Sequence, residues 1–359
     1  MDLAGMSDLP SVAITIVTYN SESYIERCVE SVLGQGYPKL EIIIVDNAST
    51  DTTLQLLPGL ENVCRVIYNV ENRGFAVAQN QAIACSSSEW ILVLNPDVLM
   101  SPGFIKSLVA AGEADPNAGT VCGKLMAIGP SFQPLAEPVL DSTGIFFTPS
   151  LRHFDRGSRM VDDGRFDRVE YVFGSTGAAA LYRRQMVDDV SIAGEFFDPD
   201  FFSYREDADV AWRAQLLGWK CLYTPEAVAY HVRRVLPENR RSTEPAINMH
   251  SVKNRWLLRL KNATWSLYRH HWLPITARDL AAILACFTVE VTSLPALWFL
   301  AKNWKATLAK RKAIMQRRRV EDSYIAQWFS NTPVSFPAAG ISEQIHARSR
   351  DLARGSTVS

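Results

Sequence analysis

Four short apolar segments, three of them followed by a polar cluster, constrain the fold of this 359-residue chain more than any other feature. The apolar segments are Val12 to Val17, Glu41 to Val45, Arg65 to Tyr68 and Trp90 to Leu94. Between them, apolar residues recur at helical spacing, most clearly in Glu22 to Leu33 and Phe75 to Cys85. Strands that alternate with helices in this way predict an α/β fold whose parallel strands are joined by right-handed crossovers.

The polar clusters follow the carboxyl ends of the expected strands, where ligands collect in open α/β sheets. They are Thr18 to Asn20, Asp46 to Asp51 and Asn95 to Asp97. In the second cluster, Asp46 is placed to accept hydrogen bonds from a ribose hydroxyl or a base N–H. Helix capping explains the same Asp, Asn and Ser residues, so both interpretations stay open.

The tripeptide Asn95-Pro96-Asp97 places a carboxylate at the mouth of a strand that is buried through Leu92 to Leu94. Mg²⁺ and Mn²⁺ prefer oxygen ligands and often combine one or two carboxylates with phosphate oxygens. Such a cation would neutralise the charge that develops on a departing diphosphate. A simple Pro-Asp turn explains the tripeptide as well.

Acidic residues also gather at the start of a helix expected over Glu206 to Leu217. Glu206, Asp207 and Asp209 fit the positive end of the helix dipole. One of them is a candidate base for deprotonating an acceptor hydroxyl, although spacing alone does not choose which. His231 follows an apolar run and is either a structural hydrogen-bonding residue or part of a metal site.

The last third of the chain differs in character. A hairpin-rich insertion is expected over Phe132 to Phe173 and a long basic helix over Pro245 to Asn262. Leu280 to Ala301 is largely apolar, is interrupted by Pro295 and has basic flanks on both sides. This charge pattern predicts an interfacial or re-entrant helical hairpin on an anionic leaflet. A buried helix followed by a solvated basic helix is the alternative.

Bulk composition excludes several classes of protein. The net charge of −1 gives no indication of nucleic-acid binding. Six scattered cysteines without a Cys-x-x-Cys pair argue against a zinc site or a disulfide framework. The segment MDLAGMSDLP does not have the pattern of a secretory signal. We therefore expect a cytoplasmic location, peripherally on the inner face of the cell membrane.

Taken together, the motifs resemble the family 2 glycosyltransferases, particularly their bacterial rhamnosyltransferase-like branch. The matching segments stand in order over residues 11 to 262, and they are VAITIVTYNSESYIERCVESVL, EIIIVDNASTD, NVENRGFAVAQNQAI, ILVLNPDV, GSTGAAALYRR, GEFFDPDFFSYREDADVAWR and AVAYHVRR. Several ordered motifs make the resemblance specific, whereas no single one would.

The resemblance implies a GT-A fold, which is a mostly parallel sheet flanked by helices, here followed by a C-terminal helical region that associates with the membrane. It implies the following domains: a tail over 1–10, the GT-A domain over 11–262, the helical region over 263–330 and a flexible tail over 331–359. It also implies a nucleoside-diphosphate-sugar donor and a direct displacement that inverts the anomeric carbon.

Site residues are carried over from the same resemblance. Asp207 corresponds to the catalytic base, and Asp97 with His231 to a site for Mg²⁺ or Mn²⁺. Contacts to the donor sugar and the acceptor fall on Gly177, Ala178, Glu206 and Trp212. The nucleotide-sugar site falls on Thr18, Tyr19, Asn20, Asp46, Asn47, Ser49, Asn72, Gly74, Phe75, Asn80, Asn95, Pro96 and Asp97.

Two features depart from the family pattern. Asn95 replaces the first aspartate of the Asp-x-Asp motif and leaves Asp97 as the strong metal ligand. Arginines also follow His231, at Arg233, Arg234, Arg240 and Arg241. They would clamp the diphosphate of the donor or of an anionic lipid-linked acceptor, or form a solvated basic loop.

The expected function is transfer of L-rhamnose from dTDP-rhamnose to a lipid-linked or polysaccharide acceptor in cell-surface glycan synthesis, as in O-antigen assembly. A UDP-sugar-dependent transferase is an alternative, and so is a non-catalytic nucleotide-sugar-binding or membrane scaffold protein. A nucleotidyltransferase is less favoured because no glycine-rich, basic triphosphate loop lies near the N-terminus. A dinucleotide-dependent dehydrogenase is disfavoured because Thr18 to Glu22 stands where a Gly-x-Gly-x-x-Gly turn would be needed.

Overall fold

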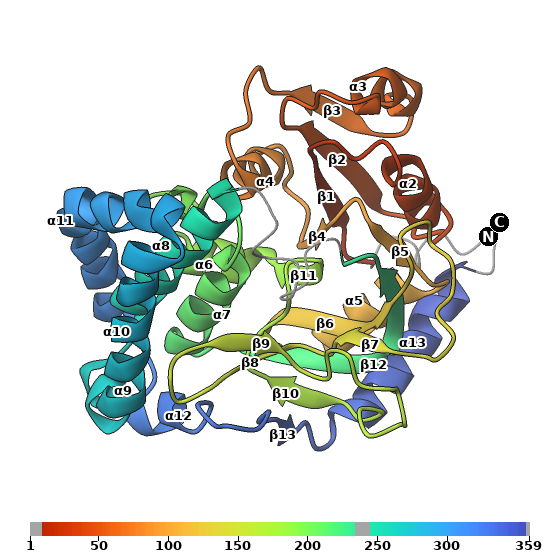
Figure 1. The fold of residues 1–359 in the computed structure, drawn as a ribbon. Coiled ribbons are helices and arrows are strands. Elements are labelled where there is room, and N and C mark those ends of the chain that lie inside the picture. Colours follow the sequence, from red (N-terminus) through yellow and green to blue (C-terminus); the bar gives the residue numbers. More distant parts are fainter. Residues whose placement is uncertain (1–8, 234–244, 357–359) are drawn as a thin grey trace.

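The computed structural model describes residues 9–233 and 245–356. Its first hundred residues alternate strand and helix, as the apolar pattern predicts (Figure 1). The elements are β1 (Val12–Thr18), α2 (Ile25–Leu33), β2 (Leu40–Asp46), α3 (Thr53–Leu56), η1 (Leu57–Leu60), β3 (Arg65–Tyr68), α4 (Phe75–Ala84) and β4 (Trp90–Leu94).

Later segments complete the sheet and its cover. They are β5 (Val98–Met100), α5 (Phe104–Ala114), β6 (Ala118–Ala127), β7 (Leu140–Ser142), β8 (Ile145–Phe147), β9 (His153–Asp155), β10 (Glu170–Val172), β11 (Ala179–Arg183), α6 (Arg184–Val190), η2 (Pro199–Phe201), α7 (Glu206–Leu216) and β12 (Lys220–His231). Strands β8 and β9 form a separate antiparallel pair, in line with a hairpin-rich insertion.

The main sheet contains eleven strands among the described residues, and its N-terminal part is parallel. Strand β1 pairs in parallel with β2 and β4, and β2 pairs in parallel with β3. Beyond β4 the sheet is mixed, because β11 runs antiparallel to both β4 and β6 while β12 is parallel to β6. The expected parallel strands are therefore confirmed for β1 to β4, whereas the sheet as a whole is mixed.

Both faces of the parallel strands are buried. Ile14 and Ile16 of β1 pack in one core together with Val29 of α2. Val17 and Val45 point to the opposite face and pack against α4. Because successive side chains of a strand point to opposite faces, apolar runs without alternation require helices on both sides. Figure 1 shows α2 and α4 on these two sides of β1 and β2.

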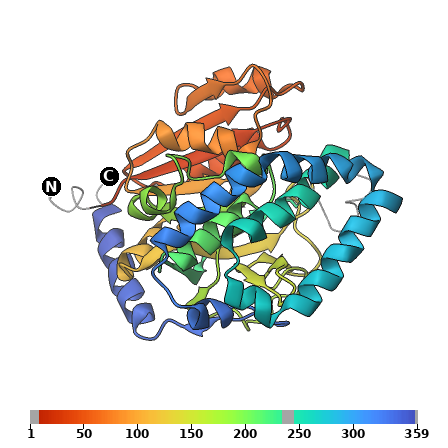
Figure 2. The same ribbon diagram turned by 90° about the vertical axis from the view of Figure 1, so that its left-hand side faces the viewer.

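The C-terminal third is mainly helical, and α8 to α11 form a layer on one side of the sheet domain (Figure 2). The elements are α8 (Pro245–Asn262), α9 (Trp265–His270), α10 (Trp272–Thr288), η4 (Val291–Ser293), α11 (Leu294–Arg317), α12 (Asp322–Ala326), β13 (Phe336–Pro337) and α13 (Ile341–Ser356). The expected basic helix over Pro245 to Asn262 is confirmed as α8.

The membrane hairpin expected over Leu280 to Ala301 falls on α10, η4 and the start of α11. The interruption lies between Thr288 and Leu294, and Pro295 stands in the first turn of α11, where a missing N–H costs little. No single helix of the described chain is long and apolar enough to cross a bilayer. The pair Trp272–Thr288 and Val291–Arg317, bent by 110°, meets that criterion only when taken together.

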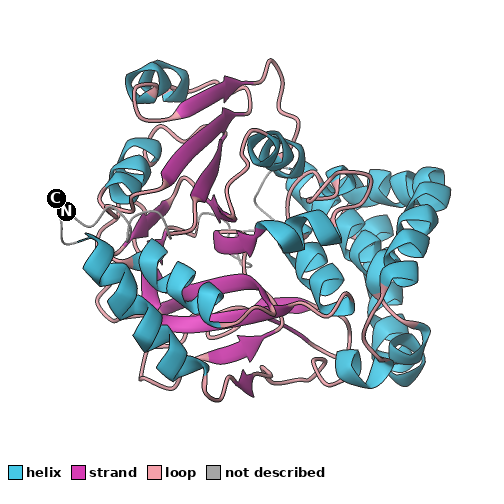
Figure 3. Ribbon diagram, turned by 180° about the vertical axis from the view of Figure 1, so that it is seen from behind, coloured by secondary structure: helices cyan, strands magenta, loops and turns pink. Residues whose placement is uncertain are grey.

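Residues 331–356 of the expected flexible tail over 331–359 include two packed elements. Strand β13 extends the sheet by pairing with β10, and α13 packs beside α5 across the sheet (Figures 1 and 3). Ile345 of α13 is buried in the same core as α2 and α5. Ile341 lies one helical turn before it, so these two side chains give α13 an apolar face that composition alone did not reveal.

A buried cation joins the helical layer to the sheet domain. Lys261 of α8 is completely buried, and its ammonium donates to Asp209 of α7 at 2.9 Å and to Asp198 at 2.5 Å. Asp209 also accepts from Arg213, and Asp198 also accepts from Lys310 of α11. These contacts lower the pKa of Asp198 against the opposing effect of burial.

Replacing Lys261 with methionine is expected to destabilise the protein by about 3–5 kcal/mol, because two buried carboxylates lose a shared partner. Urea unfolding followed by circular dichroism measures this loss. Lys312→Met is the matched control, since Lys312 is an exposed lysine on α11 and its removal should leave the unfolding midpoint unchanged. Equal midpoints for the two variants would show that Lys261 does not hold the helical layer in place.

Candidate active site

The loops after β1 and β2 are joined by Asp46. Its carboxylate accepts from the Thr18 hydroxyl at 2.9 Å and from the Ser49 amide and hydroxyl at 3.0 and 2.6 Å. Asp46 is completely buried, and these bonds hold the two loops together rather than cap a helix, since the N-cap of α3 is Thr52. A contact between Asp46 and a nucleotide stays a prediction, and it requires this loop to open.

Tyr19 and Asn20 lie at the outer edge of the same loops. Asn20 has a positive φ of 52°, its amide donates to Ser49, and its side chain accepts from the Thr50 amide at 2.8 Å. The Tyr19 side chain is 47% exposed at the mouth of the sheet. Tyr19 is therefore open to a ligand without movement of the loop.

Asn47 links the end of β2 to the loop before α4. It donates to Asn72 at 2.8 Å and accepts from the Arg73 amide at 3.0 Å, while Asn72 accepts from the Gly74 amide at 2.9 Å. Gly74 has φ of 82°, and a Cβ added there would lie 2.6 Å from Phe202. Glycine is therefore required both for the conformation and for the close approach of the chain. Phe75 begins α4 directly after it.

Two predicted contacts have structural roles instead. Asn80 of α4 binds the segment before η2: its side chain donates to the Phe197 carbonyl at 2.7 Å and accepts from the Phe197 amide at 2.9 Å. Trp212 is completely buried against Phe147 and Phe329, which corrects its expected contact with a sugar or acceptor. The reason is helical geometry, because five residues of helix turn Trp212 about 140° away from Asp207.

Asp97 and His231 meet where β5 pairs with β12. Both side chains are largely buried, and Nε2 of His231 lies 3.4 Å from Oδ1 of Asp97. The other ring nitrogen, Nδ1, lies 2.8 Å from Asp141. Burial lowers the pKa of His231, but Asp141 and then Asp97 outweigh it and raise the pKa to about 10.

This arrangement fits a divalent cation in one respect. Metal-binding histidines usually donate their second ring N–H to a carboxylate, as His231 can to Asp141, so that the first nitrogen faces the metal. That nitrogen faces Asp97, a carboxylate of the type that Mg²⁺ and Mn²⁺ prefer. Among residues 9–233 and 245–356 no cluster of three His, Cys, Asp or Glu side chains is arranged to hold a metal. A cation here would need further oxygen ligands from a diphosphate.

Arg233 is neutralised by two carboxylates rather than left open to a phosphate. Its guanidinium lies 2.7 Å from Asp141 and 2.6 Å from Asp155. The sequence analysis missed both aspartates because they lie in the irregular insertion and no motif marks them. Of the other arginines expected to clamp a diphosphate, Arg234, Arg240 and Arg241 lie outside the described residues.

The acidic pair at the start of α7 has two distinct environments. Asp207 is partly exposed, and its Oδ2 accepts from the Gly177 amide at 2.9 Å. Burial raises the pKa of Asp207, while hydrogen bonds from Gly177 and Ala208 oppose the rise. Glu206 is buried, and burial followed by the charge of Asp207 raises its pKa to about 8. Asp209 is excluded as a base because it belongs to the Lys261 network.

The two halves of the site are linked through the loop before β11. Gly177 contacts Asp207, and the carbonyl of the next residue, Ala178, accepts from the Asn95 amide at 2.8 Å. Asn95 and Pro96 lead directly into Asp97. The structure therefore brings the expected base and the expected metal ligand to the same edge of the sheet.

Hydrogen bonds from a residue of α8 hold the turn before α7, and the sequence did not reveal them. Phe202, Tyr204 and Arg205 all have positive φ, between 64° and 72°, which non-glycine residues rarely adopt. The buried side-chain amide of Asn254 in α8 lies 2.7 to 2.8 Å from the carbonyls of Phe201, Ser203 and Tyr204. A helix far along the chain thus sets the conformation of the turn that presents Glu206 and Asp207.

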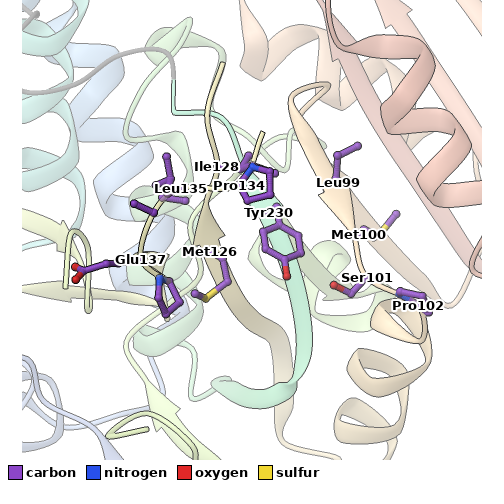
Figure 4. A pocket seen from close by; sticks show the side chains of 13 residues that line it. Leu99, Met100, Ser101, Pro102, Met126, Ile128, Pro134, Leu135, Glu137 and Tyr230 are labelled. Atoms are coloured by element: carbon purple, nitrogen blue, oxygen red, sulfur yellow. The ribbon is translucent and has the colours of Figure 1, made fainter. Parts of the chain in front are cut away.

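A separate hollow of about 620 Å³ lies beside the site (Figure 4). Leu99 and Tyr230 pair across β5 and β12 and line it. Its lining is mostly apolar and contains no lysine or arginine. The hollow therefore lacks the cations that a diphosphate requires.

Comparison with known proteins gives the class. Residues 13–190 match the model of the Glycosyl transferase family 2. The structure resembles GalNAc-T7 with UDP, GalNAc and Mn²⁺ (TM-score 0.54, 16% identity, 71% of this chain and 48% of that chain). It also resembles Staphylococcus aureus TarS (TM-score 0.51, 16% identity, 96% and 54%). These likenesses support the GT-A fold, and the match over residues 13–190 supports a family 2 glycosyltransferase.

Two curated relatives are similar in sequence. An uncharacterized glycosyltransferase of Haemophilus influenzae is 31% identical over 29% of this chain and 33% of its own length. The N-acetylglucosaminyl-diphospho-decaprenol L-rhamnosyltransferase of Mycobacterium tuberculosis is 29% identical over 62% of this chain and 75% of its own length. The match therefore spans a third of one relative and three quarters of the other.

The raised pKa of Glu206 makes stability depend on pH. Glu206 keeps its proton up to about pH 8 in the folded chain, whereas in the unfolded chain it releases the proton near the ordinary glutamate pKa of 4.5. The contribution of Glu206 to stability is complete below the unfolded pKa of 4.5, and it is lost as the pH rises towards the folded pKa of about 8. Glu206→Gln removes this pH-dependent loss of stability. The unfolding temperature of the variant is therefore expected to rise relative to that of the parent protein between about pH 5 and pH 8.

Thermal unfolding across this pH range tests the expectation. Glu71→Gln is the control, because Glu71 is exposed and its substitution should leave the pH profile parallel to that of the parent. A constant difference between Glu206→Gln and the parent over the whole range would contradict a buried, protonated Glu206.

Proposed function

We propose that this chain transfers a sugar from a nucleoside diphosphate to an acceptor hydroxyl with inversion of the anomeric carbon. The contact between Asp207 and the Gly177 amide at 2.9 Å carries the proposal. Through Ala178 and Asn95 it joins a partly exposed carboxylate to the strand end that bears Asp97. A base and a site for the leaving diphosphate then stand at one edge of the sheet.

In the proposed reaction, Asp207 takes the proton of the acceptor hydroxyl. The acceptor oxygen forms a bond to the anomeric carbon as the bond between that carbon and the diphosphate oxygen breaks. The electron pair of the broken bond leaves with the nucleoside diphosphate. The raised pKa of Asp207 favours this role, because a base works best when its pKa approaches the working pH.

Asp97 and His231 would hold a Mg²⁺ or Mn²⁺ ion together with the donor diphosphate. Such an ion would neutralise the negative charge that develops on the leaving diphosphate. Asp141 orients the His231 ring, and Arg233 balances the charge of Asp141 and Asp155. Binding of the ion requires His231 to lose its second proton, so the affinity for the cation should fall as pH decreases.

The sequence relatives support candidates for the sugar and the acceptor. The Mycobacterium tuberculosis relative is an N-acetylglucosaminyl-diphospho-decaprenol L-rhamnosyltransferase, which supports an L-rhamnosyl donor such as dTDP-rhamnose and a lipid-linked acceptor here. A UDP-sugar is the second candidate. It is supported by the poly-beta-1,6-N-acetyl-D-glucosamine synthase of Staphylococcus aureus, which is 25% identical over 63% of this chain and 50% of its own length.

A lipid-linked acceptor would place the reaction on the inner face of the cell membrane, in synthesis of a cell-surface glycan such as O-antigen. The acceptor hydroxyl would approach Asp207 from the side of Gly177 and Glu206. This location is part of the proposal and rests on the name of the relative together with the sequence of α10 and α11.

Donor turnover tests the proposed activity. The chain is incubated with dTDP-rhamnose and with a panel of UDP- and GDP-sugars, in Mg²⁺ or Mn²⁺ and then in a chelator. We expect release of the nucleoside diphosphate from one donor, abolished by the chelator, because Asp97 and His231 alone leave the diphosphate charge uncompensated. Tight nucleotide binding without release from any donor, even with lipid-linked acceptors present, would instead indicate a binding or scaffold protein.

Asp207→Asn is expected to lower turnover by about 10²–10⁴-fold, since the amide cannot accept the acceptor proton. Nucleotide affinity, measured by calorimetry, should stay within about twofold because the amide can still accept from Gly177. Asp163→Asn changes an exposed carboxylate outside the site and serves as the control. A parallel loss of affinity and turnover would assign Asp207 a structural role.

A further inference from the structure

The outer side of the α10–η4–α11 hairpin carries an apolar surface that the described chain does not cover. Within the 17 residues of α10, Ile275 and Cys286 are the buried side chains. The exposed large apolar side chains of α10 are Trp272, Leu273, Leu280, Ile283, Leu284 and Phe287. A helix that faced a protein core would bury side chains of this kind.

The exposed apolar residues of α10 share one side of the helix. At about 100° per residue, the six side chains from Trp272 to Phe287 fall within a stripe about 120° wide. Ile275 and Cys286 lie outside this stripe, about 100–120° from its centre, and are buried. The stripe is therefore a defined face rather than a scatter of single exposed side chains, which would need no explanation.

The face continues past the bend into α11. Val289, Val291 and Trp298 are 71%, 53% and 69% exposed. Lys302 and Lys305 follow one and two turns after Trp298, and both are exposed. We call the six α10 side chains, these three apolar residues and the two lysines the outer hairpin face. Figure 2 shows the helical layer that carries it.

The charge around this face is one-sided. Between 263 and 312 the chain has seven lysines and arginines but two acids, Asp279 and Glu290. Asp279 is engaged by Arg259 at 2.6 Å and lies 3.5 Å from Arg255. Lys302 and Lys305 are exposed near the apolar stripe and form no ion pair with an acid of the described chain.

The distal half of α11 is fixed to the sheet domain. Lys310 contacts Asp198 at 2.6 Å, and Arg317 and Arg319 contact Asp189 at 3.3 and 2.8 Å. These ion pairs hold the end of α11 against the sheet domain, while the outer hairpin face is exposed to solvent.

We propose that the outer hairpin face binds the surface of a bilayer that contains anionic lipids, with α10 lying in the plane of the membrane. Aromatic and aliphatic side chains would enter the boundary between headgroups and acyl chains, where Trp is favoured. Lys302 and Lys305 would contact the anionic headgroups, with a gain that grows with each cation near the surface. A second copy is a poorer partner, because a twofold interface would place the same cations against each other.

This inference does not rest on the proposed function, because binding to lipid is measured without donor or acceptor. The full chain is floated with vesicles of phosphatidylcholine alone or of phosphatidylcholine mixed with phosphatidylglycerol. We expect binding to the mixed vesicles. Combined Trp272→Ser, Phe287→Ser and Trp298→Ser substitutions should weaken it by more than about 100-fold, because three large apolar side chains no longer leave water.

Lys302→Glu with Lys305→Glu should weaken binding to the mixed vesicles by at least about tenfold and leave weak binding to neutral vesicles unchanged. Val70→Ser is the matched control, since Val70 is completely exposed in the loop after β3 and lies outside the hairpin. Thermal unfolding checks that each variant is folded, and the exposed positions predict unchanged midpoints.

Three results would overturn the inference. One is a parent protein that does not float with either vesicle, and another is a triple variant that floats as well as the parent. The third is a dimer in sedimentation that the triple variant abolishes while vesicles fail to bind, which would assign the face to a second copy.

Discussion

The placement of the acidic pair at α7 depends on one buried ammonium group. Lys261 bridges Asp198 and Asp209, and so joins α8 to the helix whose first residues are Glu206 and Asp207. Such a bridge adds little net stability over an apolar contact, but it is costly to break and it specifies one arrangement. Asn254 lies two turns earlier in α8. Its side-chain amide donates hydrogen bonds to the turn with positive φ that leads into Glu206. The helical layer is therefore part of the site's architecture rather than an appendage to the sheet.

Two charged clusters share the edge of the sheet and differ in how their charges are balanced. Around His231, the carboxylates of Asp97 and Asp141 face an imidazole with a raised pKa and the guanidinium of Arg233. Around Glu206, burial favours the protonated acid, while Asp207 next to it is partly exposed and bonded to Gly177. Two neighbouring acids with different environments are suited to different tasks, one in positioning and one in proton transfer.

The hydrophobic pattern of the sequence predicted the buried parallel strands and the polar residues that follow them. Unbroken apolar runs and the polar residues after them located β1 to β4 and the edge that carries Asp97. The same reasoning failed where contacts with residues distant in the sequence determine a side chain's direction or partner. Trp212 stands five residues after Asp207 and turns into the core, and the last helix packs on α5 although its composition resembled that of a flexible tail. Asp141 lies 90 residues from His231, in a segment without periodicity, so no local signal could have paired them.

The proposed reaction is a direct displacement at the anomeric carbon, with Asp207 as the base on one side and the diphosphate on the other. The anomeric configuration of the product, read by proton NMR for the donor that the chain turns over, distinguishes this reaction from its alternatives. We expect a configuration opposite to that of the donor, because a single displacement inverts the carbon once. A product with the donor's configuration would contradict it and would require either two displacements or attack from the same face as the leaving group.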